Sequence, residues 1–255
     1  MSRYYESWEP GTFPHQRALC EALAATPYAL DDDPFNPLTL RLVAALEATN
    51  RLAQTLERPI PTAAPSTVDL EQAEAGEPTL AWVADRPMLL TFEVRTGRDG
   101  DFPVTEAQSC LFQFIHAYTG ALDRVGREIS LLLDGDGRRP GWRSAAQPRT
   151  LRRWRGRHPA LTAWLSGPTA APLLRAFDYL AWFQEAGFLP TNAEPADNGR
   201  RWRLWIPEAG PNSSAAMSVD ALQLCRVLQR DACTVFNGVY HMLHQQVEQQ
   251  GPPPW

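Results

Sequence analysis

A single, mainly helical domain is the fold that the sequence predicts. Two long stretches, 105–133 and 218–249, repeat apolar residues at the three-to-four-residue spacing of an amphipathic helix. The chain has 255 residues, of which 44% are hydrophobic, so it is long enough to bury a sizeable core in one unit. We find no internal repeat and expect one helical domain over 1–255, with a small β-hairpin and with surface loops or insertions at 57–77 and 134–157.

The first part of the chain is expected to contain two helices and the hairpin. The first helix covers His15–Ala25 and the second covers Leu38–Leu56, after Pro37, which suits a first helical turn. Residues 31–33 are three aspartates before a proline and are expected in a turn. The segment 79–94 is the best strand candidate, and Pro87 implies an edge, a turn or a break between two short pieces.

The clearest helix is expected over 105–133. Thr105 and Gln108 have the spacing of a capping box at its start, and the glycines of residues 134–137 end it. Eight arginines follow between residues 138 and 157. Because the protein as a whole is acidic, we interpret this run as a solvated loop.

Shorter elements and one more long helix complete the prediction. Helices are expected over 159–165 and 172–186, followed by a long loop over 187–217 in which residues 200–206 form a short strand. Ser218 is expected to cap the last helix, which extends to about Gln249 before Gly251 and three prolines.

Composition excludes several classes of protein. A net charge of −5 gives no overall attraction for nucleic acid or anionic membranes. The stretch MSRYYESWEPG does not have the basic-then-apolar pattern expected of a signal peptide, and no apolar run reaches the length of a membrane span. We therefore expect a cytoplasmic protein with neither partner. All 24 basic residues are arginines, and PLP enzymes and P-loop NTPases both need a lysine amine. The four cysteines form no CxxC pair and are expected in the apolar core.

The two long helices share an unusual lack of charge. Sixteen uncharged residues lie between Glu106 and Asp123, with His116 taken as neutral, and another sixteen lie between Asp231 and Glu248. A surface helix of this length normally carries a charged stripe. We therefore expect both helices to wall a buried pocket, although a second packing surface gives the same pattern.

Histidines within these stretches are candidate ligands. On a helical wheel, His116 lies opposite the apolar face, and His244 borders the apolar face of its helix more closely than His241 does. His241, His244 and Glu248 lie within about 60° of one another and could chelate a non-heme metal. The alternatives are a hydrogen-bonded core residue at His116 and a solvated residue near the helix C-terminus at His241.

Two segments resemble a known superfamily. The sequence FQFIHAY of residues 112–118, followed by Leu122, Asp123 and Arg124, resembles the distal-pocket helix of the tryptophan 2,3-dioxygenase superfamily, and residues 236–244 resemble its proximal-ligand helix. Members of this superfamily are helical, bind heme through a histidine, and include heme-dependent tyrosine hydroxylases. The Glu-Leu-Trp run of the dioxygenases is absent, so the resemblance favours a smaller, hydroxylase-like relative.

The resemblance implies a heme-dependent oxygenase or hydroxylase of specialised metabolism that acts on an aromatic amino acid or a related small aromatic, with oxygen or peroxide as oxidant and b-type heme as cofactor. The site residues implied are His116, Tyr118 and Arg124 for catalysis; His244, His241, Arg127 and Tyr240 for heme, with His244 as the iron ligand; and Phe112, Arg203 and Trp205 for the substrate. Two rivals stay open. One is a non-heme enzyme with a single iron or other transition metal at His241, His244 and Glu248, and the other is a non-catalytic helical binding or partner protein. A homo-oligomer is compatible with each.

Overall fold

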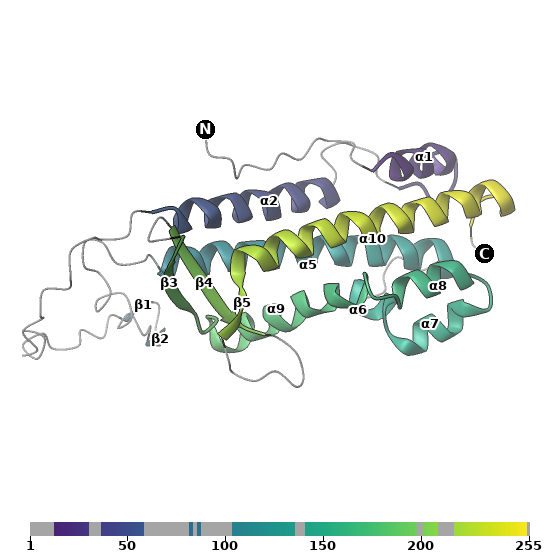
Figure 1. Ribbon diagram of the computed structural model, residues 1–255. Helices are drawn as coiled ribbons and strands as arrows, with labels where there is room; N and C mark the ends of the chain where they lie inside the picture. The colour runs from purple at the N-terminus through teal and green to yellow at the C-terminus, as the bar shows by residue number, and fades with distance from the viewer. Residues whose placement is uncertain are drawn as a thin grey trace, which may run out of the picture.

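Three long helices lie side by side and form the body of an elongated molecule (Figure 1). The computed structural model describes residues 13–30, 37–58, 82–83, 86–87, 104–135, 141–197, 201–208 and 217–253. The long helices are α2 over Pro37–Leu56, α5 over Val104–Asp134 and α10 over Ala221–Gln250. The predicted mainly helical class is therefore confirmed. Among the described helices, none combines the length and the apolar character that crossing a membrane requires.

Helices α2 and α5 are antiparallel and form the most extensive helix pair. At one end, Arg58 pairs with Glu106, whose other carboxylate oxygen accepts a hydrogen bond from Thr55 over 3.2 Å. Towards the other end, Arg41 lies against Gly120, where an added β-carbon would collide with the guanidinium group. Because residue numbers rise along α5 as they fall along α2, the two helices run in opposite directions.

Helix α10 packs parallel to α5, and two buried tyrosines mark their register. The Tyr118 hydroxyl donates a hydrogen bond to the Leu228 carbonyl oxygen over 2.8 Å. Further along both helices, the Tyr240 hydroxyl donates to the Glu128 carboxylate over 2.7 Å. The apolar face predicted for α5 is fully buried at Ala107, Phe114, Tyr118, Leu122, Val125 and Ile129.

The stretch 134–157 was expected to be a surface loop, and this expectation is wrong for most of it. Helix α6 covers Trp142–Ala145 and α7 covers Pro148–Arg155, while residues 136–140 lie outside the described part. The two tryptophans of this stretch, Trp142 and Trp154, are fully buried and anchor the short helices to the bundle. Gly126 permits this close approach, since a β-carbon there would lie only 2.3 Å from the Trp142 amide nitrogen.

The remaining elements are shorter and surround the long helices. Helix α1 packs on α10, and α9 packs on α5. A small antiparallel sheet has β4 between β3 and β5. The bounds are Pro14–Leu23 for α1, Pro159–Leu165 for α8, Ala171–Leu174 for the 3-10 helix η1, Arg175–Ala186 for α9, Asn192–Ala196 for β3, Arg201–Pro207 for β4 and Met217–Asp220 for β5. Of these three strands, sequence predicted only the central one, because NAEPA contains a proline and no β-branched or aromatic residue, and the alternation in MSVD covers only four residues.

Two helix starts differ from the prediction. Helix α10 is capped by Asp220, whose carboxylate accepts a hydrogen bond from the Gln223 amide over 3.0 Å, whereas Ser218 belongs to β5. Gln108 does not close a capping box. Instead, its side-chain amide exchanges hydrogen bonds with the backbone of Leu189, just after α9. Both side chains therefore connect the helices to the neighbouring sheet and loop.

Only four residues of the predicted hairpin are described. Strand β1, Trp82–Val83, pairs antiparallel with β2, Arg86–Pro87, which places Pro87 in an edge strand, a position open to proline. The rest of 79–94, the three aspartates at 31–33 and residues 59–77 of the expected loop lie outside the described residues.

Candidate functional site

His116 and Phe112 lie on the face of α5 that is turned towards α9. The His116 ring stacks on Phe112 with centroids 5.9 Å apart, and Phe112, which is 42% exposed, meets the edge of Phe183 from α9 at 5.4 Å. This face looks away from the α5–α10 interface. The expectation that His116 lines a buried pocket is therefore wrong.

The two histidines predicted to bind the iron lie towards the other end of the bundle. His241 is exposed, and the His244 side chain is 21% exposed, with its Nε2 3.9 Å from Glu248 Oε1. The hydrogen bond from Tyr118 to Leu228 places these two residues at the same level of the bundle, and His116 lies two residues before Tyr118. His244 follows Leu228 by 16 residues. Sixteen residues of α-helix rise about 24 Å, so His116 and His244 are far apart.

These positions do not fit a heme held between His116 and His244. Tyr118 and Tyr240, which hydrogen-bond across the interface between α5 and α10, are each 0% exposed, as are Phe114 and Phe236 of the same two helices. The lack of charge on α5 and α10 has another physical cause. Helix α5 packs against α2, α6, α9 and α10, and α10 packs against α1, α2, α5 and α8, so each has neighbours on several sides.

Two more of the predicted site residues, Arg124 and Tyr240, belong to a buried polar network. At its centre is Glu128, which is 5% exposed and accepts hydrogen bonds from Arg124 Nε and from the Tyr240 hydroxyl, each over 2.7 Å. Gln16 of α1 donates to the same hydroxyl over 3.4 Å. Burial, and then the charge of Glu128, raise the pKa of Tyr240 well above its ordinary value. The network joins α1, α5 and α10, and sequence analysis missed Gln16 and Glu128 because nothing local marks such a contact.

Tyr118 and Arg127 are not brought to a common site. The hydroxyl of Tyr118 is directed to the Leu228 carbonyl oxygen inside the bundle, and burial raises the pKa of Tyr118 well above its ordinary value. Arg127 is exposed near Asp123. Burial raises the pKa of Asp123, while its hydrogen bond from the Trp142 amide and the nearby Arg127 act in the opposite direction. Tyr118 is therefore a packing residue, and Arg127 is a surface cation beside Asp123.

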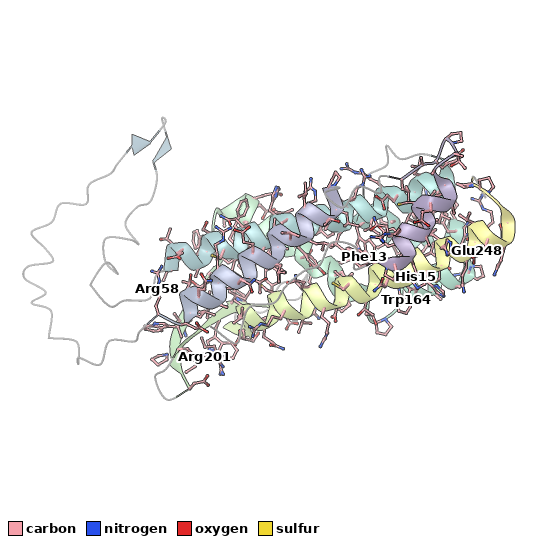
Figure 2. The ribbon with its side chains drawn as sticks, turned by 90° about the horizontal axis from the view of Figure 1, so that it is seen from above. Phe13, His15, Arg58, Trp164, Arg201 and Glu248 are labelled. Carbon is pink, nitrogen blue, oxygen red and sulfur yellow. The ribbon has the colours of Figure 1, made fainter. Side chains whose placement is uncertain are left out.

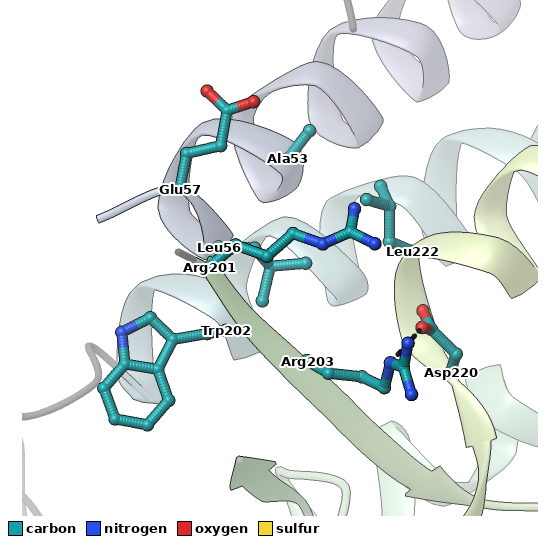
Figure 3. Close-up of a pocket in the computed structure, with 8 residues that line it drawn as sticks. All are labelled: Ala53, Leu56, Glu57, Arg201, Trp202, Arg203, Asp220 and Leu222. Atoms are coloured by element: carbon teal, nitrogen blue, oxygen red, sulfur yellow. Dashed lines mark ion pairs between the residues drawn. The ribbon is translucent and has the colours of Figure 1, made fainter. Parts of the chain in front are cut away.

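The predicted substrate residues Arg203 and Trp205 lie on β4. Arg203 Nε is 3.5 Å from Asp220 Oδ2, and its guanidinium lies 5.4 Å from the centre of the Trp205 ring. Figure 3 shows Arg203 at a small pocket between α2, β4 and the start of α10, which is lined by Ala53, Leu56, Glu57, Arg201, Trp202, Arg203, Asp220 and Leu222. The space in it that water can reach is about 20 Å³, which suits a water molecule and not an aromatic amino acid.

One contact between histidines was missed by sequence analysis. The ring of His15 in α1 lies against the ring of His241 in α10, with centroids 4.4 Å apart and planes tilted by 56°. Beside it, Phe13 packs against both Phe236 and Tyr240 at 6.0 Å. Figure 2 shows His15 at the end of the bundle near Glu248. No sequence signal finds this pair, because its members lie at opposite ends of the chain.

The histidine pair is a contact of two side chains and not a complete metal site. Within the described ranges, no group of three His, Cys, Asp or Glu side chains is arranged to hold a metal ion. Comparison of the chain with protein-family models, with curated proteins and with solved structures gives no match. The resemblance to the tryptophan 2,3-dioxygenase superfamily therefore stays a prediction.

Proposed function

We propose that the chain is a metal-binding helical protein in which a divalent transition-metal ion joins α1 to α10. The observation that carries this proposal is the contact of the His15 and His241 rings at 4.4 Å across two helices. Imidazole is the most common protein ligand for metals of this kind and suits Zn²⁺, Ni²⁺ and Cu²⁺. Two imidazoles from different helices would let the ion connect elements that are distant in sequence.

The geometry needs only side-chain adjustment. A bound Zn²⁺ lies about 2.0 to 2.1 Å from each ligating nitrogen. His241 is exposed and His15 is partly exposed, so both rings can rotate towards a common ion without disturbing the core.

Two further groups on α10 can complete the ligand set. His244 and Glu248 lie one and two turns after His241 on the same side of the helix. Glu248 is 62% exposed and therefore free to change rotamer. Three imidazoles and a carboxylate would complete the four-coordinate shell of a structural Zn²⁺ site, whereas two imidazoles and a carboxylate would leave one position for water, as in catalytic sites.

Binding of the ion is expected to hold α1 in place over the buried network. Gln16, one residue after His15, donates to Tyr240, and Phe13 packs on the same ring. A ligand that binds only the folded chain stabilises it, by about 2.7 kcal/mol when the free ion is at 100 times its Kd. The proposal therefore gives the metal a structural role at this junction.

The test is calorimetric titration of tag-free, chelator-treated protein with Zn²⁺ and Ni²⁺, combined with thermal unfolding. We expect one ion per chain and a rise in Tm, and we expect His15→Ala and His241→Ala each to abolish both effects. His116→Ala is the matched control, because it removes a surface histidine that contacts Phe112 and not another imidazole. Equal binding by all four proteins would refute the proposal. Protons compete with the metal for imidazole, so affinity should fall in acid.

A hemin titration separates this proposal from the heme-dependent oxygenase predicted from sequence. We expect no stoichiometric Soret band, since the described side chains leave no porphyrin-sized space between α5 and α10. A Soret band that disappears in His244→Ala but persists in His15→Ala would support heme ligation and overturn the metal proposal.

A further inference from the structure

We infer that helices α6 and α7, with the turn that follows α7, present a surface for the phosphate backbone of a nucleic acid. We call it the arginine surface; it consists of the exposed residues Arg143, Arg149, Arg152, Arg153, Arg155 and Arg157. The inference is independent of the metal proposal, because it uses none of the histidines named there.

Charge is strongly segregated along the chain. Between residues 137 and 177 there are nine arginines and no aspartate or glutamate, whereas the whole chain has 24 basic and 29 acidic residues. The net charge of −5 is therefore the sum of a basic region and of a rest of the chain that is more acidic than the total indicates. The sequence-based expectation of no nucleic-acid partner rested on net charge alone, and net charge does not describe a surface on which the charges are separated.

The folded helix α7 turns its arginines outward. Its apolar residues Leu151 and Trp154 are buried, and Trp154 Nε1 donates to Asp134 Oδ1 over 3.1 Å. Arg153 pairs with the second oxygen of Asp134. Asp134 thus fixes α7 to the end of α5, and the remaining arginines of the helix are displayed on an ordered surface and not on a flexible loop.

Helix stability accounts for only part of the charge on α7. Cations are favourable in the last turn of a helix, which explains Arg152, Arg153 and Arg155. Arg149 lies in the first turn, where the helix dipole disfavours a cation and where α7 has no acidic residue. Arg149 and Arg153 are also like charges one turn apart, although Asp134 pairs with Arg153 and offsets this repulsion. The placement of Arg149 in the first turn is the one that points to an external anion.

The chemistry of the surface favours phosphates over a protein or a membrane. Protein interfaces and membrane-binding helices both use apolar anchors. The large apolar side chains that are exposed in the described part of the chain are Leu40, Val43, Phe112 and Phe188, and none of them belongs to α6, α7 or α8. Arginine binds phosphate oxygens through paired N–H donors. Trp142 and Trp154 are buried, and the ring of Trp164 lies against Gly238 of α10, so the surface offers no exposed aromatic side chain for stacking on bases and recognition should be independent of sequence.

Neighbouring contacts hold the surface rigid. Trp164 of α8 donates to the Val235 carbonyl oxygen over 3.2 Å, and its ring lies against Gly238, where a β-carbon would collide with it. His158, between α7 and α8, is buried and hydrogen-bonded to Gln246 of α10. The arginine surface is thus fastened to the last long helix and needs little reorganisation to bind.

The experiment measures fluorescence anisotropy of labelled 20-base-pair DNA and RNA duplexes, each in two unrelated sequences, over a range of salt concentrations. We expect all four probes to bind with similar affinity. The slope of log affinity against log salt concentration should be steeper by about 0.9 for each phosphate contacted. The triple variant Arg149→Gln, Arg152→Gln, Arg155→Gln should weaken binding at least about tenfold in low salt and should reduce the salt slope by about one for each contact removed. Circular dichroism confirms that each variant is folded.

A matched control separates local from overall charge. Arg41→Gln, Arg51→Gln and Arg230→Gln together remove the same charge from exposed positions on α2 and α10, and this variant should bind as the unmodified protein does. Equal weakening by both triple variants would overturn the inference. The inference would also be overturned if polyglutamate displaced the labelled duplex as effectively, per charge, as unlabelled duplex does. Binding to phosphatidylserine vesicles without binding to duplexes would overturn it as well.

Discussion

Replacing Tyr240 with phenylalanine tests whether the buried network stabilises the fold. The substitution keeps the ring, which packs against Phe13, and removes only the hydroxyl. Glu128 then loses a hydrogen bond of 2.7 Å, and Gln16 loses its acceptor at 3.4 Å. Glu128 is 5% exposed and Gln16 is 8% exposed, so water cannot readily replace the lost partner.

The expected cost follows from this burial. Leaving one buried polar group without its partner costs about 1 to 3 kcal/mol, and more when the group is charged. We therefore expect Tyr240→Phe to lower the free energy of unfolding by about 2 to 3 kcal/mol. Tyr118→Phe is the matched control. Its hydroxyl donates to the carbonyl oxygen of Leu228, which lies inside α10 and is positioned to accept a helical hydrogen bond as well, so about 0.5 to 1.5 kcal/mol is expected.

Urea unfolding followed by circular dichroism measures both values. A double-mutant cycle of Tyr240→Phe with Glu128→Gln should show a coupling energy of about 0.5 to 3 kcal/mol, the range for residues in direct contact. If Tyr240→Phe costs no more than Tyr118→Phe, or if the cycle shows no coupling, the hydrogen bond to Glu128 does not stabilise the fold and the reasoning is refuted.

Three further perturbations have clear expected outcomes. Gly126→Ala places a β-carbon 2.3 Å from a backbone nitrogen of α6 and should cost about 1 to 3 kcal/mol in urea unfolding, whereas Gly156→Ala, with no atom within 4 Å of the new carbon, should cost nothing. Folding raises the pKa of Tyr118 and Tyr240, so the unfolded chain loses these protons first. The contribution of these two tyrosines to stability should therefore be constant below about pH 10 and should fall above it by about 1.4 kcal/mol per pH unit for each tyrosine, which the difference in unfolding between the protein and its Tyr118→Phe and Tyr240→Phe variants at pH 8 to 11 will check. Burial raises the pKa of Cys225, so mass spectrometry should find this thiol unmodified by iodoacetamide until the protein unfolds.

The extent of the long helices could be predicted because their signals are local. The range expected for α2, 38–56, differs by one residue from the observed start at Pro37, since proline at the first turn and leucines on one face are properties of neighbouring residues. Helix α7 carried a similar signal: Pro148 stands at its first position, and Leu151 and Trp154 are three residues apart. The arginines between these residues obscured it, because polarity alone does not separate a solvated loop from one face of an amphipathic helix.

The candidate site could be predicted only in part, because it depends on which helix faces which. The lack of charge on α5 was read as a pocket wall, but packing against several neighbours also removes charge from a helix. His15 and His241 meet only because α1 folds back on α10, and no periodicity encodes that contact. For the same reason, Glu128 is an ordinary charged residue in sequence and a buried hydrogen-bond acceptor in the structure.

The two proposals share one end of α10, and this location makes them testable together. His241 lies on α10 near Gln246, which holds His158 beside the arginine surface. An ion bound at His241 adds positive charge at the end of the molecule where we infer phosphate binding, and at 0.1 M salt such charges act over about 10 Å. We therefore expect Zn²⁺ to tighten duplex binding at low salt, and linkage requires the duplex to tighten Zn²⁺ binding by the same factor. His241→Ala should remove both effects while retaining metal-free duplex binding. If Zn²⁺ changes duplex affinity equally in that variant, the coupling does not pass through His241.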